Sequence, residues 1–355
     1  MIEQYGWSDA LCQDFAPHAA QGRAPGRVTV QQRGLYIVAT DFGDLNAQLS
    51  GRLMHEAEEA GHPAVGDWVA VAPRPDEGAA TIHAVLPRRT AFLRKAAYTV
   101  QDVQVVAANV DLAFLAASMN ADFNPRRLER YLASAWQSGA RPVVVLTKAD
   151  LCDDAEAMVA AAEAVAIGAP VLAVSAMTGD GMDGLAAHLR PGETCVLVGS
   201  SGVGKSTLVN ALAGAVLMDT GGIREDDARG RHTTTHRELV LLPGGALILD
   251  TPGMRELGLM DAGDGLEATF EDIEALARDC RFNDCGHRNE PGCAVREALE
   301  AGVLDEARWR GFQKLQRELS FLELKEDRLA REANRKRWVA VTKANRARAK
   351  SRGDW

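Results

Sequence analysis

One short motif constrains the fold of this chain more than any other part of the sequence. Residues 199–207 read GSSGVGKST and match the pattern G-x-x-x-x-G-K-[ST]. An apolar run at 195–198 precedes the motif, and an apparent helix over 207–213 follows it. A strand, a glycine-rich loop and a helix in this order form a P-loop, whose backbone N–H groups converge on phosphate oxygens. The motif therefore predicts a nucleotide-binding α/β domain with a mostly parallel sheet.

The chemistry of a P-loop assigns roles to its polar residues. We expect Lys205 to neutralise the β- and γ-phosphates as a catalytic residue, and the Ser206 hydroxyl to ligate Mg²⁺. The predicted phosphate-binding residues are Gly199, Ser200, Ser201, Gly202, Val203, Gly204, Lys205, Ser206 and Thr207.

Two loops upstream of the P-loop predict which base is bound. A TKAD stretch follows the apolar strand 143–146, and SAM follows the strand 171–174. The Asp150 carboxylate can accept hydrogen bonds from guanine N1–H and the 2-amino group together, a donor pair that adenine lacks. Loops at the carboxyl ends of parallel strands lie together at one edge of the sheet, so these loops and the P-loop would form a single binding site. This site predicts GTP and GDP as ligands. The predicted base-reading residues are Thr147, Lys148, Ala149, Asp150, Ser175, Ala176 and Met177.

Two stretches downstream of the P-loop predict switch elements. The DTPG stretch at 250–253 ends the strand 246–249 and resembles D-x-x-G, in which Asp250 holds Mg²⁺ through water and the Gly253 N–H senses the γ-phosphate. The GRHTTTH stretch at 230–236 is typical of a loop that becomes ordered around a γ-phosphate and Mg²⁺. We predict that Ser206, Thr234 and Asp250 form the Mg²⁺ site.

The order of these motifs is unusual. In ordinary GTPases the phosphate loop comes first and the base-reading motif comes late. Here the two base-reading loops (G4 and G5 in the usual numbering of GTPase motifs) come first, followed by the phosphate loop (G1) and the two switch stretches (G2 and G3), which gives the order G4-G5-G1-G2-G3. The chain would then form the same sheet but begin at a different strand than in ordinary GTPases. This order predicts a circularly permuted GTPase domain over residues 98–262.

The flanking regions have a different composition. Residues 1–24 have no clear period and predict a flexible lead-in. Short β-rich runs at 28–30, 35–38, 68–71 and 81–85 are separated by Gly, Pro and Asp, which predicts an OB-fold-like RNA-binding barrel over residues 25–97.

A cluster of cysteines and a histidine lies in the predicted helical region over residues 263–328. Cys280, Cys285, His287 and Cys293 supply three thiolates and one imidazole within fourteen residues. This donor set suits one tetrahedral, structural Zn²⁺.

The net charge of −9 conceals a strong asymmetry. Residues 325–355 carry 11 Lys and Arg against 4 Asp and Glu, so residues 329–355 form a basic tail. Arg88, Arg89, Arg94 and Lys95 also gather where the barrel meets the GTPase domain. A solvated basic helix and a solvated linker remain alternatives, but both features favour RNA as a partner.

Other features exclude whole classes of protein. No run of about 18–20 apolar residues could cross a membrane, and the first residues do not form a signal peptide. Six scattered and clustered cysteines do not form a disulfide scaffold. We expect a cytoplasmic protein without a membrane partner, monomeric when free.

Taken together, the chain resembles the RsgA family of circularly permuted GTPases, which assist late maturation of the small ribosomal subunit. The resemblance covers nearly the whole chain and includes stretches 34–36, 65–69, 86–89, 108–111, 127–132 and 230–235. It implies binding to the small (30S) subunit and its 16S rRNA, with GTP hydrolysis stimulated by the subunit and coupled to release. It also implies that the four cluster residues bind zinc.

The resemblance further implies a catalytic role for His232 in positioning the attacking water. Met254 stands where many GTPases have a Gln, so intrinsic hydrolysis should be slow. Thr147 stands where the family more often has Asn, which predicts weaker guanine affinity. A P-loop kinase or ATPase, or an RNA-binding adaptor that uses GTP only as a ligand, are the alternative functions.

Overall fold

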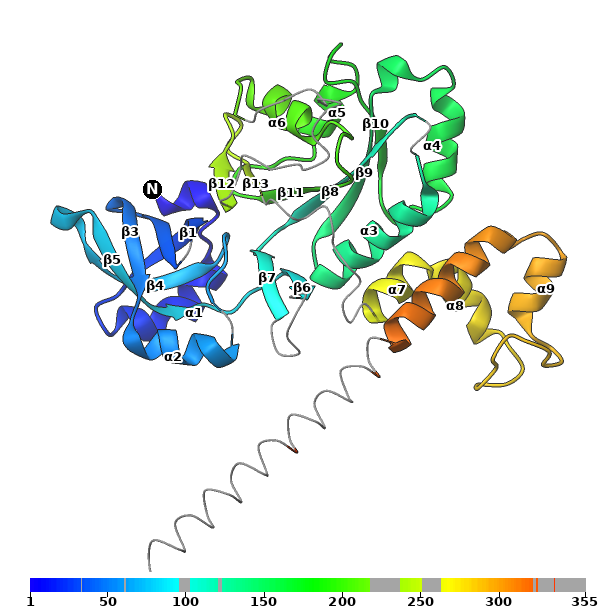
Figure 1. Cartoon of the computed structure of the whole chain (residues 1–355), viewed down its shortest axis with the longest axis horizontal. Helices are drawn as coiled ribbons and strands as arrows, with labels where there is room; N and C mark the ends of the chain where they lie inside the picture. The colour runs from blue at the N-terminus through cyan, green and yellow to red at the C-terminus, as the bar shows by residue number, and fades with distance from the viewer. Residues whose placement is uncertain are drawn as a thin grey trace, which may run out of the picture.

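The computed structural model describes residues 1–32, 34–60, 62–95, 103–120, 123–217, 237–250 and 263–321, together with Leu324 and Arg335. It contains a barrel, a sheet covered by helices on both faces, and a group of C-terminal helices. Figure 1 shows the barrel and the C-terminal helices on opposite sides of the central sheet.

The barrel contains five strands in the order β1-β2-β3-β5-β4, and a further pairing of β1 with β4 closes it. Helix α2 (Gly51–Ala60) connects β3 to β4. This is the OB-like barrel that the sequence predicted, with β3 as a strand that the sequence did not reveal. The strands are β1 (Ala24–Gln32), β2 (Leu35–Thr40), β3 (Gly43–Leu49), β4 (Trp68–Arg74) and β5 (Ala79–Val85).

The first 24 residues differ from the flexible lead-in that the sequence predicted. They contain a 3-10 helix, Ile2–Tyr5, and helix α1, Asp9–Ala19. Leu11 and Phe15, one helical turn apart, are buried against Trp68 of the barrel. Two apolar residues are too few to produce a visible helical period, and they suffice because the barrel supplies the rest of the apolar surface.

The central sheet has the strand order β10-β9-β8-β11-β13-β12. All neighbouring pairs are parallel except β12 with β13, which are antiparallel. The base-reading strand β9 precedes the P-loop strand β11 in the chain, so the permuted order of the motifs is also the order in which the chain enters the sheet. The strands are β8 (Leu112–Ser118), β9 (Arg141–Thr147), β10 (Val171–Ala173), β11 (Thr194–Val198), β12 (Arg237–Leu241) and β13 (Leu247–Asp250).

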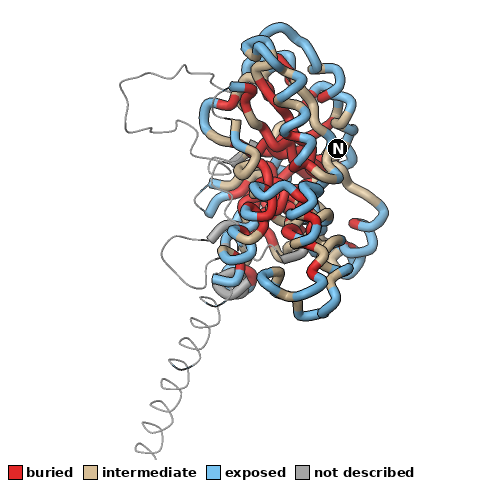
Figure 2. Tube along the Cα trace, turned by 90° about the vertical axis from the view of Figure 1, so that its right-hand side faces the viewer, coloured by how far each residue is buried: buried red, intermediate tan, exposed pale blue. Residues whose placement is uncertain are grey.

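Helices cover the two faces of this sheet. Along β8, Ala113 and Leu115 belong to one apolar cluster and Leu112 and Phe114 to another, because successive side chains of a strand point to opposite faces. Buried residues therefore run through the middle of the molecule, with exposed residues on the outer helices (Figure 2). One face carries α3 (Pro125–Ser138) and α4 (Ala155–Glu163), and the other carries α5 (Met182–Ala186) and α6 (Lys205–Ala213).

The barrel and the central sheet form one continuous sheet of 11 strands. Strand β1 pairs antiparallel with β12, with Val30 opposite Glu238 and Gln31 opposite Arg237. A separate two-stranded ribbon, β6 (Ala91–Lys95) with β7 (Val103–Ala108), lies between the barrel and β8 in the chain.

The C-terminal helices have their own core, which includes Phe270, Trp309 and Phe312. The rings of Trp309 and Phe312 stack at 5.5 Å between centroids. No helix among the described residues is long and apolar enough to cross a membrane. The helices are α7 (Gly263–Thr269), α8 (Glu271–Arg278), α9 (Ala294–Glu300) and a further helix over residues 306–321.

Candidate nucleotide-binding site

The predicted P-loop is a strand-loop-helix element in the structure. It connects the end of β11 to α6, which begins at Lys205. The Lys205 Nζ atom donates hydrogen bonds to the carbonyl oxygens of Gly199, at 2.7 Å, and Ser200, at 2.6 Å. A Cβ atom on Gly199 would collide with the carbonyl oxygen of Ala116 on β8, so only glycine lets the loop pass this close to its neighbour.

The first base-reading loop lies directly against the P-loop. Thr147 ends β9, and its hydroxyl donates a hydrogen bond of 2.5 Å to the carbonyl oxygen of Val203. The Lys148 Nζ atom donates a hydrogen bond of 2.8 Å to the carbonyl oxygen of Gly202. Lys148 has a φ of 61°, a left-handed conformation that is uncommon for a side chain of this type. These two contacts fix the distance between the base-reading loop and the phosphate loop.

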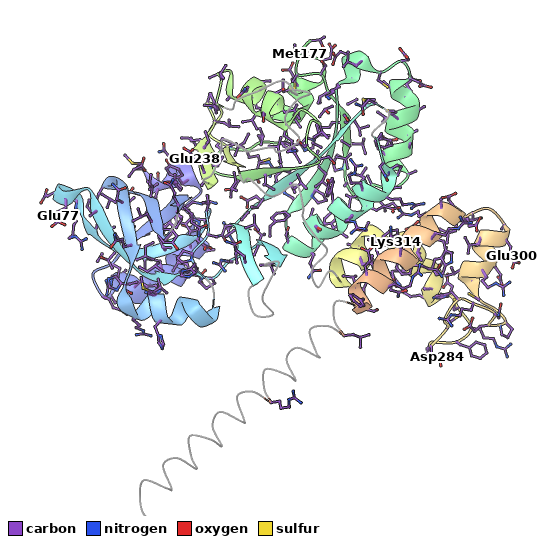
Figure 3. All side chains as sticks on the ribbon, viewed as in Figure 1. Glu77, Met177, Glu238, Asp284, Glu300 and Lys314 are labelled. Atoms are coloured by element: carbon purple, nitrogen blue, oxygen red, sulfur yellow. The ribbon has the colours of Figure 1, made fainter. Side chains whose placement is uncertain are left out.

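The second base-reading loop orients the carboxylate of the first. The Ser175 hydroxyl donates a hydrogen bond of 2.6 Å to Asp150 Oδ1, and it accepts one from the Thr178 N–H. One carboxylate oxygen is thereby held by the protein. Met177 is exposed at the edge of the domain (Figure 3). The structure thus brings together the three loops that the sequence assigned to phosphate and base.

Thr147 shows how the departure from Asn is accommodated. Its hydroxyl has one donor, and that donor is used on the phosphate loop. An Asn amide would offer two donors and an acceptor at the same place. The weaker guanine affinity expected from this exchange remains a prediction.

The predicted switch residues are only partly described. Asp250 ends β13, with Glu238 of β12 as its backbone partner. His232, Thr234, Gly253 and Met254 lie outside the described residues.

The predicted metal ligands converge. The ligand atoms of Cys280, Cys285, His287 and Cys293 all lie within 4.8 Å of one another. The His287 Nδ1 atom lies 3.6 Å from Cys280 Sγ and 3.4 Å from Cys293 Sγ. Thiolates bound to a single tetrahedral Zn²⁺ are about 3.8 Å apart. The four residues therefore fit a zinc ion with no open coordination position.

The loop around these ligands is fixed independently of them. The Glu290 carboxylate accepts hydrogen bonds from the backbone N–H groups of Gly286, Arg288 and Asn289. The backbone N–H of Glu290 itself and these three groups lower the pKa of the Glu290 carboxyl. Asp284 of this loop and Met177 of the second base-reading loop lie at opposite ends of the view in Figure 3.

The basic residues near the barrel differ in their roles. The Arg88 guanidinium donates hydrogen bonds of 2.7 Å to both carboxylate oxygens of Asp67, which is fully buried. Arg88 is therefore a structural residue of the barrel. The side chains of Arg94 and Lys95 lie outside the described part of the chain.

Two functional candidates on α3 were not found from the sequence. The Arg127 guanidinium donates a hydrogen bond of 2.7 Å to the Ser200 hydroxyl of the P-loop, and the Tyr131 hydroxyl lies 3.4 Å from the same atom. Their spacing of four residues places them on one face of the helix. That spacing and the P-loop were both visible in the sequence, but the contact between them was not.

These features define a class of protein. The structure combines a strand, a glycine-rich loop and a helix with an aspartate held by Ser175. The loops follow strands of a mostly parallel sheet in a permuted order, as in a circularly permuted P-loop GTPase. The fold class predicted from the sequence is confirmed.

Comparisons with known proteins give the family. Residues 85–260 match the family described as RsgA GTPase. A relative from Opitutus terrae is 47% identical over 364 residues, which cover 100% of this chain and 99% of the relative. A relative from Streptomyces coelicolor is 46% identical over 340 residues, which cover 95% of this chain and 92% of the relative. Both are named small ribosomal subunit biogenesis GTPase RsgA. The chain belongs to the RsgA GTPase family and is a GTPase.

Solved structures agree with this assignment. The crystal structure of YjeQ from Thermotoga maritima is 28% identical, with a TM-score of 0.63 over 84% of this chain and 98% of that one. The structure of YloQ, described as a circularly permuted GTPase, is 24% identical with a TM-score of 0.61 over 84% of this chain and 95% of that one. The second likeness concerns the fold alone.

Proposed function

We propose that this chain binds the small (30S) ribosomal subunit and its 16S rRNA, assists late maturation of the subunit, and is released when GTP is hydrolysed. The observation that supports the proposal is that the first base-reading loop contacts the P-loop, while Ser175 of the second loop hydrogen-bonds to Asp150. This arrangement suits a guanine nucleotide. The relatives are named for biogenesis of the small subunit, and the same partner is proposed here.

The test compares GTP hydrolysis with and without purified small subunits. We expect the subunits to raise turnover strongly, because Met254 leaves the chain without the usual water-orienting glutamine. An equal rate with and without subunits would contradict the proposal. Measured phosphate release also separates it from an adaptor that uses GTP only as a ligand.

Competition between nucleotides separates this function from a kinase or ATPase. A hundredfold excess of ATP should leave bound GTP in place, because adenine has no donor pair for the Asp150 carboxylate. Displacement by ATP at that excess would favour the alternative class.

The proposed metal site for catalysis consists of Ser206, Thr234 and Asp250. Mg²⁺ would neutralise charge on the β- and γ-phosphate oxygens. Ser206 fits this role, since it lies in the first turn of α6, directly after the phosphate-binding Lys205. The remaining phosphate contacts are proposed for the loop Gly199–Thr207 and for the Gly253 N–H.

His232 is proposed to position the attacking water. His232→Ala should lower subunit-stimulated turnover about a hundredfold, which is the usual scale for a lost acid–base or positioning group. His188→Ala, at a position that follows α5 and lies outside the switch stretch, serves as a control and should leave turnover unchanged. Unchanged turnover in the His232 variant would contradict this role.

The regions on either side of the GTPase domain are proposed to bind RNA. Residues 25–97 would form the RNA-binding barrel, residues 98–262 the GTPase domain, residues 263–328 the zinc-binding domain and residues 329–355 a basic tail. The 11 Lys and Arg of residues 325–355 support this, and binding to subunits should weaken steeply as salt is raised. We propose one structural zinc, a cytoplasmic location and a monomer when the protein is free.

A further inference from the structure

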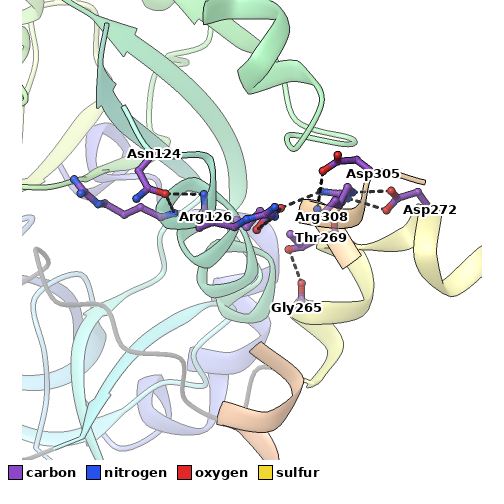
Figure 4. Close-up of polar contacts among 9 residues, drawn as sticks. Asn124, Arg126, Gly265, Thr269, Asp272, Asp305 and Arg308 are labelled. Carbon is purple, nitrogen blue, oxygen red and sulfur yellow. Dashed lines mark hydrogen bonds and ion pairs between the residues drawn. The ribbon is translucent and has the colours of Figure 1, made fainter. Parts of the chain in front are cut away.

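The first turn of α3 holds Arg127 in a fixed position beside the P-loop. Asn124 caps this helix, because its Oδ1 atom accepts hydrogen bonds from the N–H groups of Arg126, at 3.0 Å, and Arg127, at 3.3 Å. Figure 4 shows this cap and the separate contacts of Arg126. Pro125 at the first helical position also restricts the backbone. The start of α3 is thus rigid before any ligand binds.

Two side chains of α3 hold a single hydroxyl of the P-loop. The Arg127 guanidinium donates to Ser200 Oγ at 2.7 Å, and the hydroxyl of Tyr131, which is buried, lies 3.4 Å from the same atom. The bond from Arg127 is charge-assisted, which makes it stronger than a bond between neutral groups. These contacts join residues that are 73 and 69 positions apart in the chain.

The same serine supports the catalytic lysine through its backbone. The Ser200 carbonyl oxygen accepts the 2.6 Å hydrogen bond from Lys205 Nζ. The position of the Ser200 peptide therefore decides where the lysine ammonium lies relative to the phosphates. A chain of contacts runs from Arg127 to the Ser200 hydroxyl, and from the Ser200 carbonyl to Lys205.

We propose that Arg127 is a positioning residue for GTP hydrolysis, which acts through Ser200 on Lys205, with Tyr131 as its support. The proposal rests on the GTPase activity and not on the identity of the ribosomal partner. The lysine contributes most when negative charge shifts between the phosphates in the transition state, so a displaced lysine lowers kcat more than it raises KM. Displacements of about 1 Å in such groups cost up to about a hundredfold in rate.

The experiment is a double-mutant cycle in the full-length protein. Arg127→Gln and Ser200→Ala should each lower the kcat of GTP hydrolysis about tenfold, with KM and GDP affinity changed less than about twofold. The double variant should be no slower than either single variant, because both remove the same contact. Arg127→Lys should recover most of the activity, since one charged donor on Ser200 Oγ is enough.

A matched control removes a charge from the other side of the same helix. Arg130 forms an ion pair of 2.9 Å with Glu318 and does not contact the P-loop in the described structure. Arg130→Gln should leave kcat unchanged. Thermal unfolding of each variant checks that the fold is intact, and Ser200→Ala tests the same contact without altering α3.

Two results would overturn the proposal. The first is a kcat for Ser200→Ala or Arg127→Gln equal to that of the unaltered protein. The second is an effect of Arg127→Gln that persists undiminished in the Ser200→Ala background. The rates are measured with and without small subunits. If the subunits do not stimulate hydrolysis, the double-mutant cycle can still be evaluated from the intrinsic rates.

Discussion

The barrel and the C-terminal helices are joined to the GTPase domain by different physical means. The barrel is joined through the backbone, because β1 pairs with β12 and extends the central sheet. The C-terminal helices are joined through side chains, mainly around α3 and α7. Backbone pairing is insensitive to substitution, whereas each side-chain contact can be removed singly.

Each joint contains a buried arginine that lies over an aromatic ring, and the two arginines differ in whether they hydrogen-bond to carboxylates. Arg27 at the barrel joint donates to the neutral oxygens of Gly66, Asn109 and Thr194, the last at 2.7 Å. It also lies over the Trp68 ring, with 5.2 Å from the guanidinium carbon to the ring centroid. Burial lowers the pKa of Arg27 to about 10.

Arg308 at the C-terminal joint donates to the carbonyl oxygen of Thr269 at 2.9 Å and has carboxylate partners in addition. It donates to Asp272 at 2.6 and 2.7 Å and pairs with Glu129 of α3 at 3.4 Å (Figure 4). The Glu129 side chain is fully buried and also forms an ion pair of 2.8 Å with the Arg126 guanidinium. At the first joint, the buried arginine supplies hydrogen-bond donors to uncharged oxygens. At the second joint, the buried arginine also compensates the negative charge of buried and half-buried carboxylates.

The largest effect should come from removing the metal. Chelation of the proposed zinc should unfold residues 263–321, since structural zinc supplies on the order of 10 kcal/mol in small domains. GDP affinity should stay within about twofold, because the described hydrogen bonds between the cluster side chains lie within the cluster and do not involve the P-loop or the base-reading loops. Circular dichroism and GDP binding measure the two regions separately. Loss of nucleotide binding together with helicity would contradict the independence of the two regions.

The next effect tests the barrel joint. Arg27→Met leaves several buried oxygens without a donor and should lower the free energy of unfolding by about 3–5 kcal/mol. Urea denaturation measures this change. Arg74→Met is the control, since Arg74 forms an exposed ion pair with Glu77 and should change stability by about 0.5 kcal/mol or less. A similar small change for Arg27 would show that the backbone pairing alone holds the barrel.

A smaller effect is expected at the C-terminal joint. Arg308→Leu should cost about 2 kcal/mol, since Arg126 still compensates the Glu129 carboxylate. Limited proteolysis of the C-terminal helices and urea denaturation both report this change. Arg310→Leu, which removes an exposed pair with Glu306, is the control. An equal loss in both variants would mean that burial of the pair is unimportant.

The smallest effect concerns pH. Burial raises the pKa of Glu129, which the neighbouring arginines only partly offset. The folded state then binds the proton more readily than the unfolded state, so the contribution of Glu129 to stability is present at acidic pH and is lost as pH rises through its folded pKa. Glu129→Gln removes this dependence. The difference in urea midpoint between the two proteins should therefore change with pH, and a constant difference would contradict the assignment.

The sequence predicted the loops of the candidate site more completely than it predicted the strands of the fold. Asp150, Ser175 and Lys205 were all predicted, because the chemistry of guanine and phosphate demands particular residue types directly after a strand. Strands β3 and β12 were not predicted. The first alternates polar and apolar residues with no β-branched side chain, and the second begins with the charged residues Arg237 and Glu238. Neither has the uninterrupted apolar run of the strands that were predicted.

The sequence by itself determined the local motifs of this protein: the P-loop, the base-reading loops and the Cys/His cluster. Each lies within a short segment, so its spacing along the chain already specifies its chemistry. Only the tertiary structure decided that Arg127 meets Ser200 and that Arg27 meets Thr194, 167 residues away. Such contacts depend on strand order and helix packing, which bring together residues whose separation along the chain carries no periodic signal.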